Sequence, residues 1–243
     1  MVVGEEKPGQ IESAVLGIAS ALQFPVFKEW ITAYFRPSAA IKAGQASLGA
    51  AAKNLAIAGF LVGVVTGIVA LLSMSISGAA AGSMARGAAG GLVGGGVGFA
   101  GGLVALVVMA VLFPIIYVIG GLIGSAVFFV LAKILGGKGS YTMQTHVVAL
   151  VMCGAALLSL PFQILGVIPL IGGIFGLATL LIELYALYGY YRTIKEVHQL
   201  SQMRAIAVMV LPIIVLVVLM VVLLGAAFLA MLGMAGAMAG TVR

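Results

Sequence analysis

Long stretches without any charged residue constrain this chain more than any other feature of its sequence. No Lys, Arg, Asp or Glu occurs from Gly139 to Ile182, or from Gly87 to Ala132. A bilayer crossing needs about 20 consecutive apolar residues, and an unpaired charge at its centre is costly. Only 7% of the residues are charged and the mean hydropathy is +1.30, whereas soluble domains have about 25% charged residues. The sequence therefore predicts an integral membrane protein.

The charge-free stretches divide into five predicted spans. As one helix, the stretch from Gly139 to Ile182 would be about twice the hydrocarbon thickness, and Pro161 and Pro169 bracket a turn inside it. Nine of the sixteen residues from Gly87 to Gly102 are Gly, and each costs about 1 kcal/mol in a helix. We therefore expect an external loop or re-entrant segment at 78–102. The predicted fold class is an all-α polytopic membrane helical bundle with spans at 55–77, 103–132, 143–163, 168–191 and 206–232, followed by an external tail at 233–243.

The distribution of basic residues supports five spans, because Lys and Arg accumulate in cytoplasmic loops. With five spans, ten basic residues lie on the side of the N-terminus, and only Arg86 and Arg243 lie on the other. A sixth span in the Gly-rich segment would make the tally six against six. We therefore predict a cytoplasmic N-terminus and an external or lumenal C-terminus.

Residues 1–54 precede the first span and are predicted to be a cytoplasmic amphipathic segment. Apolar residues repeat at helical spacing from Ile11 to Leu22, and aromatic and charged residues then alternate from Phe27 to Arg36. This pattern is typical of a segment in the headgroup layer, where it contacts anionic lipid or a partner, or of an anchor packed against the bundle. Candidate contacts on the cytoplasmic side are Trp30, Arg36, Lys138, Arg192, Lys195 and His198.

Glycines at four-residue spacing predict close helix packing within the spans. They occur at Gly59, Gly63 and Gly67, at Gly120 and Gly124, and at Gly172 and Gly176. Contacts within the bundle are the expected explanation, and a homo-oligomer face is the alternative.

Glu183 is the acidic residue inside a predicted span, nine residues before Arg192. A carboxylate inside the bilayer has a high free-energy cost unless it is protonated or paired. It indicates either an ionisable site for protons or cations, with Thr179, His146 or Tyr117 as neighbours, or a protonated Glu bonded to another helix.

Several chemistries are excluded or unsupported. The chain has no Asp and one Cys, Cys153, so aspartyl proteolysis and an intrachain disulfide are excluded. In the phosphate-loop-like segment 135–140, Gly139 follows Lys138 where that loop needs Ser or Thr, and Ala132 stands at the first Gly position. We therefore predict that the protein is not an enzyme and that it binds no metal, cofactor or nucleic acid.

Three segments resemble the Yip family, the Ypt/Rab-interacting five-span membrane proteins. They read Ala-Lys-Ile-Leu-Gly-Gly-Lys-Gly-Ser-Tyr at 132–141, Ile-Pro-Leu-Ile-Gly at 168–172 and Ile-Lys-Glu-Val-His-Gln-Leu-Ser at 194–201. The upstream segments 27–30 and 35–38 are similar to the family's N-terminal segment, and the form looks like the prokaryotic, archaeal branch. The chain departs at Gln199, where the family often has Gly, and in the Gly-rich insert.

The resemblance implies a cytoplasmic N-terminus, five spans and no catalytic residues. Eukaryotic relatives act in vesicle trafficking and bind prenylated small GTPases, and in a prokaryote the location would be the cell membrane. We therefore expect a non-enzymatic protein that organises or shapes membrane, or scaffolds partners, through its cytoplasmic face. The expected partners are the lipid bilayer, anionic lipids, a cytoplasmic protein and a second copy of the chain. The alternative is a small transporter or channel that uses Glu183.

Overall fold

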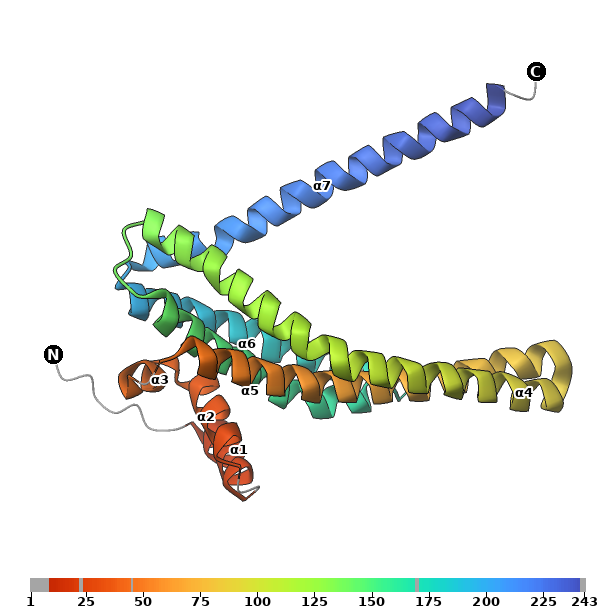
Figure 1. Cartoon of the computed structure of the whole chain (residues 1–243), viewed down its shortest axis with the longest axis horizontal. Helices are drawn as coiled ribbons and strands as arrows, with labels where there is room; N and C mark the ends of the chain where they lie inside the picture. Colours follow the sequence, from red (N-terminus) through yellow and green to blue (C-terminus); the bar gives the residue numbers. More distant parts are fainter. Residues whose placement is uncertain (1–8, 22–23, 45, 169–170, 241–243) are drawn as a thin grey trace.

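The fold is all-α. The computed structural model describes residues 9–21, 24–44, 46–168 and 171–240, which contain no strand. Their helices are α1 (Gln10–Ala21), α2 (Pro25–Phe35), α3 (Pro37–Ala43), α4 (Leu48–Ile134), α5 (Tyr141–Leu165), α6 (Gly172–His198) and α7 (Gln202–Gly240). In Figure 1, α4, α5 and α6 run roughly along the long axis, α1 and α2 lie steeply across it, and α7 diverges from the bundle.

Helix α4 is a hairpin, although its 87 residues are continuous in secondary structure. Arg86 and Gly87 have non-helical backbone angles, and Gly87 has a φ of +68°, a left-handed conformation that glycine adopts without penalty. The two halves then run back along each other (Figure 1), with Gly82 beside Gly90 and Gly78 beside Gly94.

The loop or re-entrant segment predicted at 78–102 is therefore helical apart from this turn. The reason is that the helix propensity of glycine counts against a helix in isolation, whereas facing glycines let two helix backbones pack closely.

The long apolar helices agree with the predicted class of fold. Four helices, α4 to α7, are long and apolar enough to cross a membrane. Because α4 turns back at Arg86, it supplies two of the predicted spans, 55–77 and 103–132. The spans predicted at 143–163, 168–191 and 206–232 lie almost wholly within α5, α6 and α7. Pro169 and the final residues of the 233–243 tail lie outside the described residues.

Helix α5 is the centre of the bundle. It packs against α2, α4 and α6, and side chains such as Leu150, Val151 and Cys153 have no exposed surface. Trp30 of α2 is equally buried. A Cβ at Gly154 of α5 would lie 2.6 Å from the Trp30 carbonyl oxygen. The N-terminal segment therefore includes a helix that packs into the core, which is the anchor alternative for this part of the chain.

The predicted glycine contacts are of two kinds. A Cβ at Gly59 would lie 2.8 Å from the Phe113 carbonyl oxygen, and Gly63 and Gly67 likewise face the second half of α4. By contrast, a Cβ at Gly120, Gly124 or Gly176 would meet no atom within 4 Å, and Gly172 contacts only the neighbouring Gly166. These four glycines therefore make no contact between spans within the described part of the chain, because spacing alone does not say which helix face meets a neighbour, and the homo-oligomer face stays a prediction for them.

Candidate functional site

The two most distinctive loop motifs meet at one end of the bundle. The backbone N–H of Lys138, in the Gly-Gly-Lys-Gly turn, donates to the His198 carbonyl at the end of α6 (3.1 Å). A Cβ at Gly137 would lie 2.7 Å from Nδ1 of His198, and one at Gly139 would lie 2.6 Å from a Val197 methyl. Only glycine allows the turn to approach α6 this closely. Arg204 of α7 also contacts this turn region, because its guanidinium donates to the Leu135 carbonyl (3.2 Å).

A buried polar network lies beneath this junction. Nε2 of His198 lies 2.7 Å from Oε1 of Gln144, and the Gln144 amide donates to the Ser125 carbonyl (2.8 Å). The Ser125 hydroxyl is 2.8 Å from that of Thr145. All four side chains are buried. Because the network joins α4, α5 and α6, it fixes the relative positions of the helices that carry the two motifs.

The surroundings of His198 disfavour its charged form. His198 lies beyond Arg192, past the end of the predicted span. Burial lowers the pKa of His198 below the ordinary value, and the positive charge of Lys133 lowers it further. The Gln144 amide donates elsewhere, so its oxygen accepts from Nε2–H of His198. Nδ1 is buried without a partner among the described residues. A proton on Nδ1 would therefore be a buried, unpaired donor.

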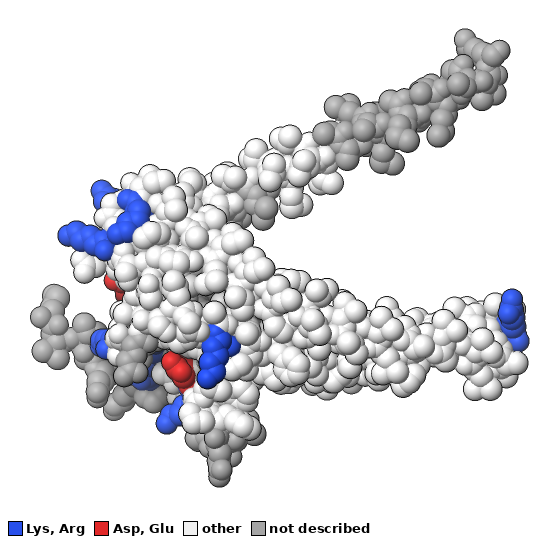
Figure 2. Space-filling model, viewed as in Figure 1, with Lys and Arg blue, Asp and Glu red and all other residues white. Residues whose placement is uncertain are grey.

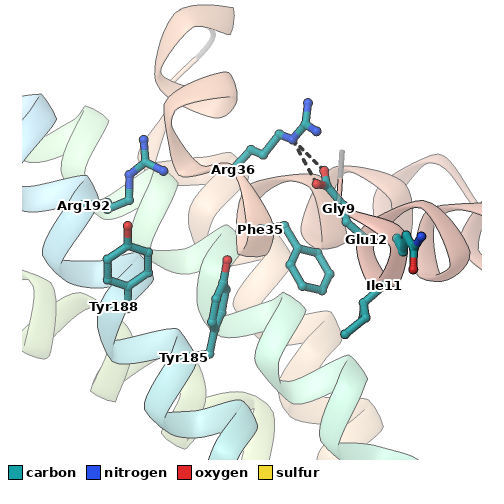
Figure 3. Close-up of a pocket in the computed structure, with 9 residues that line it drawn as sticks. Gly9, Ile11, Glu12, Phe35, Arg36, Tyr185, Tyr188 and Arg192 are labelled. Carbon is teal, nitrogen blue, oxygen red and sulfur yellow. Dashed lines mark hydrogen bonds and ion pairs between the residues drawn. The ribbon is translucent and has the colours of Figure 1, made fainter. Parts of the chain in front are cut away.

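A cavity of about 550 Å³ opens between α1, α2 and α6. We call it the arginine pocket; its lining is Gly9, Gln10, Ile11, Glu12, Phe35, Arg36, Tyr185, Tyr188 and Arg192. In Figure 3, the guanidinium groups of Arg36 and Arg192 lie at one end, and both tyrosine hydroxyls point toward that end. The Phe35 ring and Ile11 lie away from it. The pocket thus has a cationic end and an apolar end.

An ion pair joins α1 to the α2–α3 junction on one wall of the pocket. Nε of Arg36 lies 2.8 Å from one carboxylate oxygen of Glu12 in α1, and donates to the other at 3.1 Å. Glu12 is buried. Nη2 of Arg36 is buried without a partner among the described residues. On the other wall, Arg192 pairs with Glu196 one turn along α6 (3.0 Å).

Basic side chains gather at the same end of the molecule as the pocket. Figure 2 shows most of the Lys and Arg surface at this end and a separate patch at the far tip of the α4 hairpin. Between Lys53 and Lys133 the sequence contains one basic residue, Arg86, which stands at the hairpin turn. The surface between the two ends is uncharged over most of its length in this view (Figure 2).

The structure places some predicted contact residues in one pocket and buries others in the core. Arg36 and Arg192, far apart in sequence, line the same pocket. Lys138 is exposed, and Lys195 is half-buried with its ammonium 6.0 Å from the Tyr191 ring centre. Direct contact with a partner or lipid was wrong for Trp30 and His198, because both side chains are fully buried. Aromatic and imidazole groups beside charges suit the core and the interface equally, so sequence cannot separate the two.

Two of the predicted neighbours of Glu183 are engaged elsewhere. Glu183 itself is exposed on α6. The Thr179 hydroxyl donates to the Phe175 carbonyl of its own helix (3.1 Å). His146 is buried and lines a different cavity, together with Lys53 and other residues of α2, α3, α4 and α5.

Of the residues that line the arginine pocket, sequence reasoning predicted only Arg36 and Arg192 as contact residues. The residues that it missed include Glu12, Phe35, Tyr185 and Tyr188. The tyrosines had a usable signal, because Tyr185, Tyr188 and Tyr191 repeat every three residues just before Arg192, as expected of aromatic side chains at a membrane interface. Glu12 had no such signal in the sequence, because its partner Arg36 lies in another segment of the chain.

Comparisons with known proteins identify one family. The model of the Yip1 domain matches residues 31–224, which include α4, α5, α6 and the first half of α7. No curated protein and no solved structure matches the chain.

Proposed function

Because the chain belongs to the Yip family of membrane proteins, we propose that it is a non-enzymatic protein that organises or shapes membrane, or scaffolds partners, through its cytoplasmic face. By cytoplasmic face we mean the end that carries α1 to α3, the α4–α5 turn and the α6–α7 turn. The observation that carries this proposal is the convergence of both family-like motifs with the arginine pocket at this one end.

Charge supports the orientation. The arginine pocket and the exposed Lys138 lie at the basic end, and the excess of Lys and Arg marks the cytoplasmic side of membrane proteins. The opposite tip of the molecule offers Arg86 alone within the α4 hairpin.

Packing and surface chemistry support a scaffold or lipid-organising role. The network around His198 and Gln144 ties the motif loops to three helices, so the face is held in one shape. Its accessible groups include cations such as Lys138, which suit anionic lipid and acidic protein surfaces.

The test is affinity purification in mild detergent, with mass spectrometry of the co-purifying proteins and lipids. The double variant Lys138→Gln/Lys195→Gln removes two cations from the face, and Arg86→Gln removes one from the opposite tip. We expect wild type and Arg86→Gln to retain a stoichiometric protein or anionic lipid that the double variant loses. Retention of the same species by the double variant would contradict the proposal.

A further inference from the structure

We propose that the arginine pocket holds the phosphate group of one anionic phospholipid, with the phosphate between Arg36 and Arg192 and the apolar part along Phe35 and the tyrosine rings. The inference deepens the proposed function and rests on it, because anionic lipids give the cytoplasmic leaflet its negative surface potential. The pocket of about 550 Å³ is within the size range of small-molecule sites.

The cationic end of the pocket has unused hydrogen-bonding capacity. The buried Nη2 of Arg36 has no partner among the described residues, and leaving such a donor unpaired is unfavourable. Its Nε already binds the carboxylate of Glu12. The pocket therefore already accommodates an oxyanion. A phosphate has more oxygens than a carboxylate, and it matches the planar fork of arginine.

The lining indicates a lipid in preference to a free phosphate ion. Phe35, Tyr185 and Tyr188 present rings below the guanidinium groups (Figure 3), and Ile11 is 74% exposed. A free ion gains nothing from these apolar surfaces, whereas a lipid presents a phosphate and hydrocarbon together.

The pocket also lies where headgroups are expected. Tyr185, Tyr188 and Tyr191 form a ladder along α6, with neighbouring ring centres 5.9 and 6.2 Å apart, and it ends beside Arg192. Tyrosines of this kind mark the boundary between hydrocarbon and headgroups, and basic residues follow on the aqueous side. The two ends of the pocket are thus arranged along the membrane normal as a phospholipid would be.

Glu12 acts in this arrangement as an internal competitor. Its carboxylate binds the arginine that the phosphate would use. Substitutions of the two partners therefore have opposite effects: loss of the Arg36 charge weakens lipid binding, and loss of the Glu12 charge strengthens it. If the ion pair had only a structural role, the two substitutions would not have opposite effects on lipid binding, because removing either partner breaks the same pair.

The experiment measures lipid binding to the full-length chain in nanodiscs or detergent by native mass spectrometry, with phosphatidic acid as the probe and phosphatidylcholine as the reference. We expect wild type to prefer phosphatidic acid. Arg36→Gln should bind it about tenfold more weakly, the effect of about 1.4 kcal/mol. Glu12→Gln should bind it several-fold more tightly, and Arg86→Gln at the far tip should match wild type.

Two soluble probes identify the source of the phosphate. Inorganic phosphate and glycerol phosphate lack the hydrocarbon, so neither should displace phosphatidic acid at equal concentration. Displacement by either would overturn the lipid assignment. Thermal unfolding of each variant shows whether it is folded, and if Arg36→Gln is unfolded, the Glu12→Gln result still decides, because an increase in affinity cannot come from a damaged protein.

Three further results would overturn the inference: no preference for phosphatidic acid in wild type, unchanged binding by folded Arg36→Gln, or weaker binding by Glu12→Gln. These outcomes are separate from failure of the proposed function. If the Lys138→Gln/Lys195→Gln variant loses a protein partner while Arg36→Gln binds phosphatidic acid as wild type does, the cytoplasmic-face proposal stands and the pocket assignment fails.

Discussion

Gln199 shows at the scale of one residue how a departure from the family pattern appears in structure. It caps the C-terminus of α6 with a φ of +52°, a left-handed conformation that favours glycine. The family often has Gly at this position. The structure thus gives a physical reason for that glycine and shows that this chain keeps the same turn with a strained residue.

Replacing Gln199 by Gly should stabilise the protein. Glycine adopts the left-handed conformation without penalty, and its greater freedom in the unfolded chain offsets part of the gain. We expect the free energy of unfolding to rise by about 0.5–1 kcal/mol, measured by denaturation in detergent. Gln199→Ala keeps the strain and should show no rise; equal stability of the Gly variant and wild type would contradict the strain.

The lowered pKa of His198 makes stability depend on pH. Its folded pKa lies below the ordinary value of 6.5, so the unfolded chain takes up a proton first as the pH falls. Stability is therefore fully present above about pH 6.5 and decreases below it. We expect unfolding temperatures measured from about pH 8 down to about pH 5 to fall less in His198→Gln than in wild type. Equal slopes would show that His198 does not carry this dependence.

At the scale of elements, the sequence predicted helix type and position well where the charge-free runs end in clear turns. The end of α5 at Leu165 falls between Pro161 and Pro169, as predicted, although Pro161 itself lies inside the helix. The helices of the N-terminal segment follow from its helical spacing. It failed for 78–102, because facing glycines between two halves of a hairpin cannot be recognised from composition. The arginine pocket was half predicted: Arg36 and Arg192 stand out as interfacial cations, but their proximity depends on how α2 packs across α6.

Paired glycine substitutions test the packing of the α4 hairpin. A Cβ at Gly59 would press against backbone atoms of Phe113 and Pro114 at 2.8 Å, whereas one at Gly120 meets nothing within 4 Å. Gly59→Ala should lower the free energy of unfolding by about 1–3 kcal/mol. Gly120→Ala should be neutral or stabilising by up to about 1 kcal/mol. If chemical denaturation gave both variants the same effect, the two halves of α4 would not pack as described.

At the scale of the whole molecule, we propose that the basic end and the tip of the α4 hairpin lie on opposite sides of the membrane. This orientation is inferred from charge, because the Lys and Arg residues concentrate in the predicted cytoplasmic loops of the sequence and gather at one end in Figure 2. The sequence suffices for this prediction because charge bias is a property of loops and does not depend on packing; the side of the membrane on which each end lies stays a prediction.

Accessibility of introduced cysteines tests that claim most directly. The native Cys153 is fully buried, so it should contribute little background. Lys138→Cys and Arg86→Cys place a thiol at the basic end and at the hairpin tip, and a membrane-impermeant maleimide is added to intact cells and then to opened ones. The account predicts labelling of Arg86→Cys in intact cells and of Lys138→Cys only after opening. Labelling of both from the same side, or the reverse pattern, would contradict it.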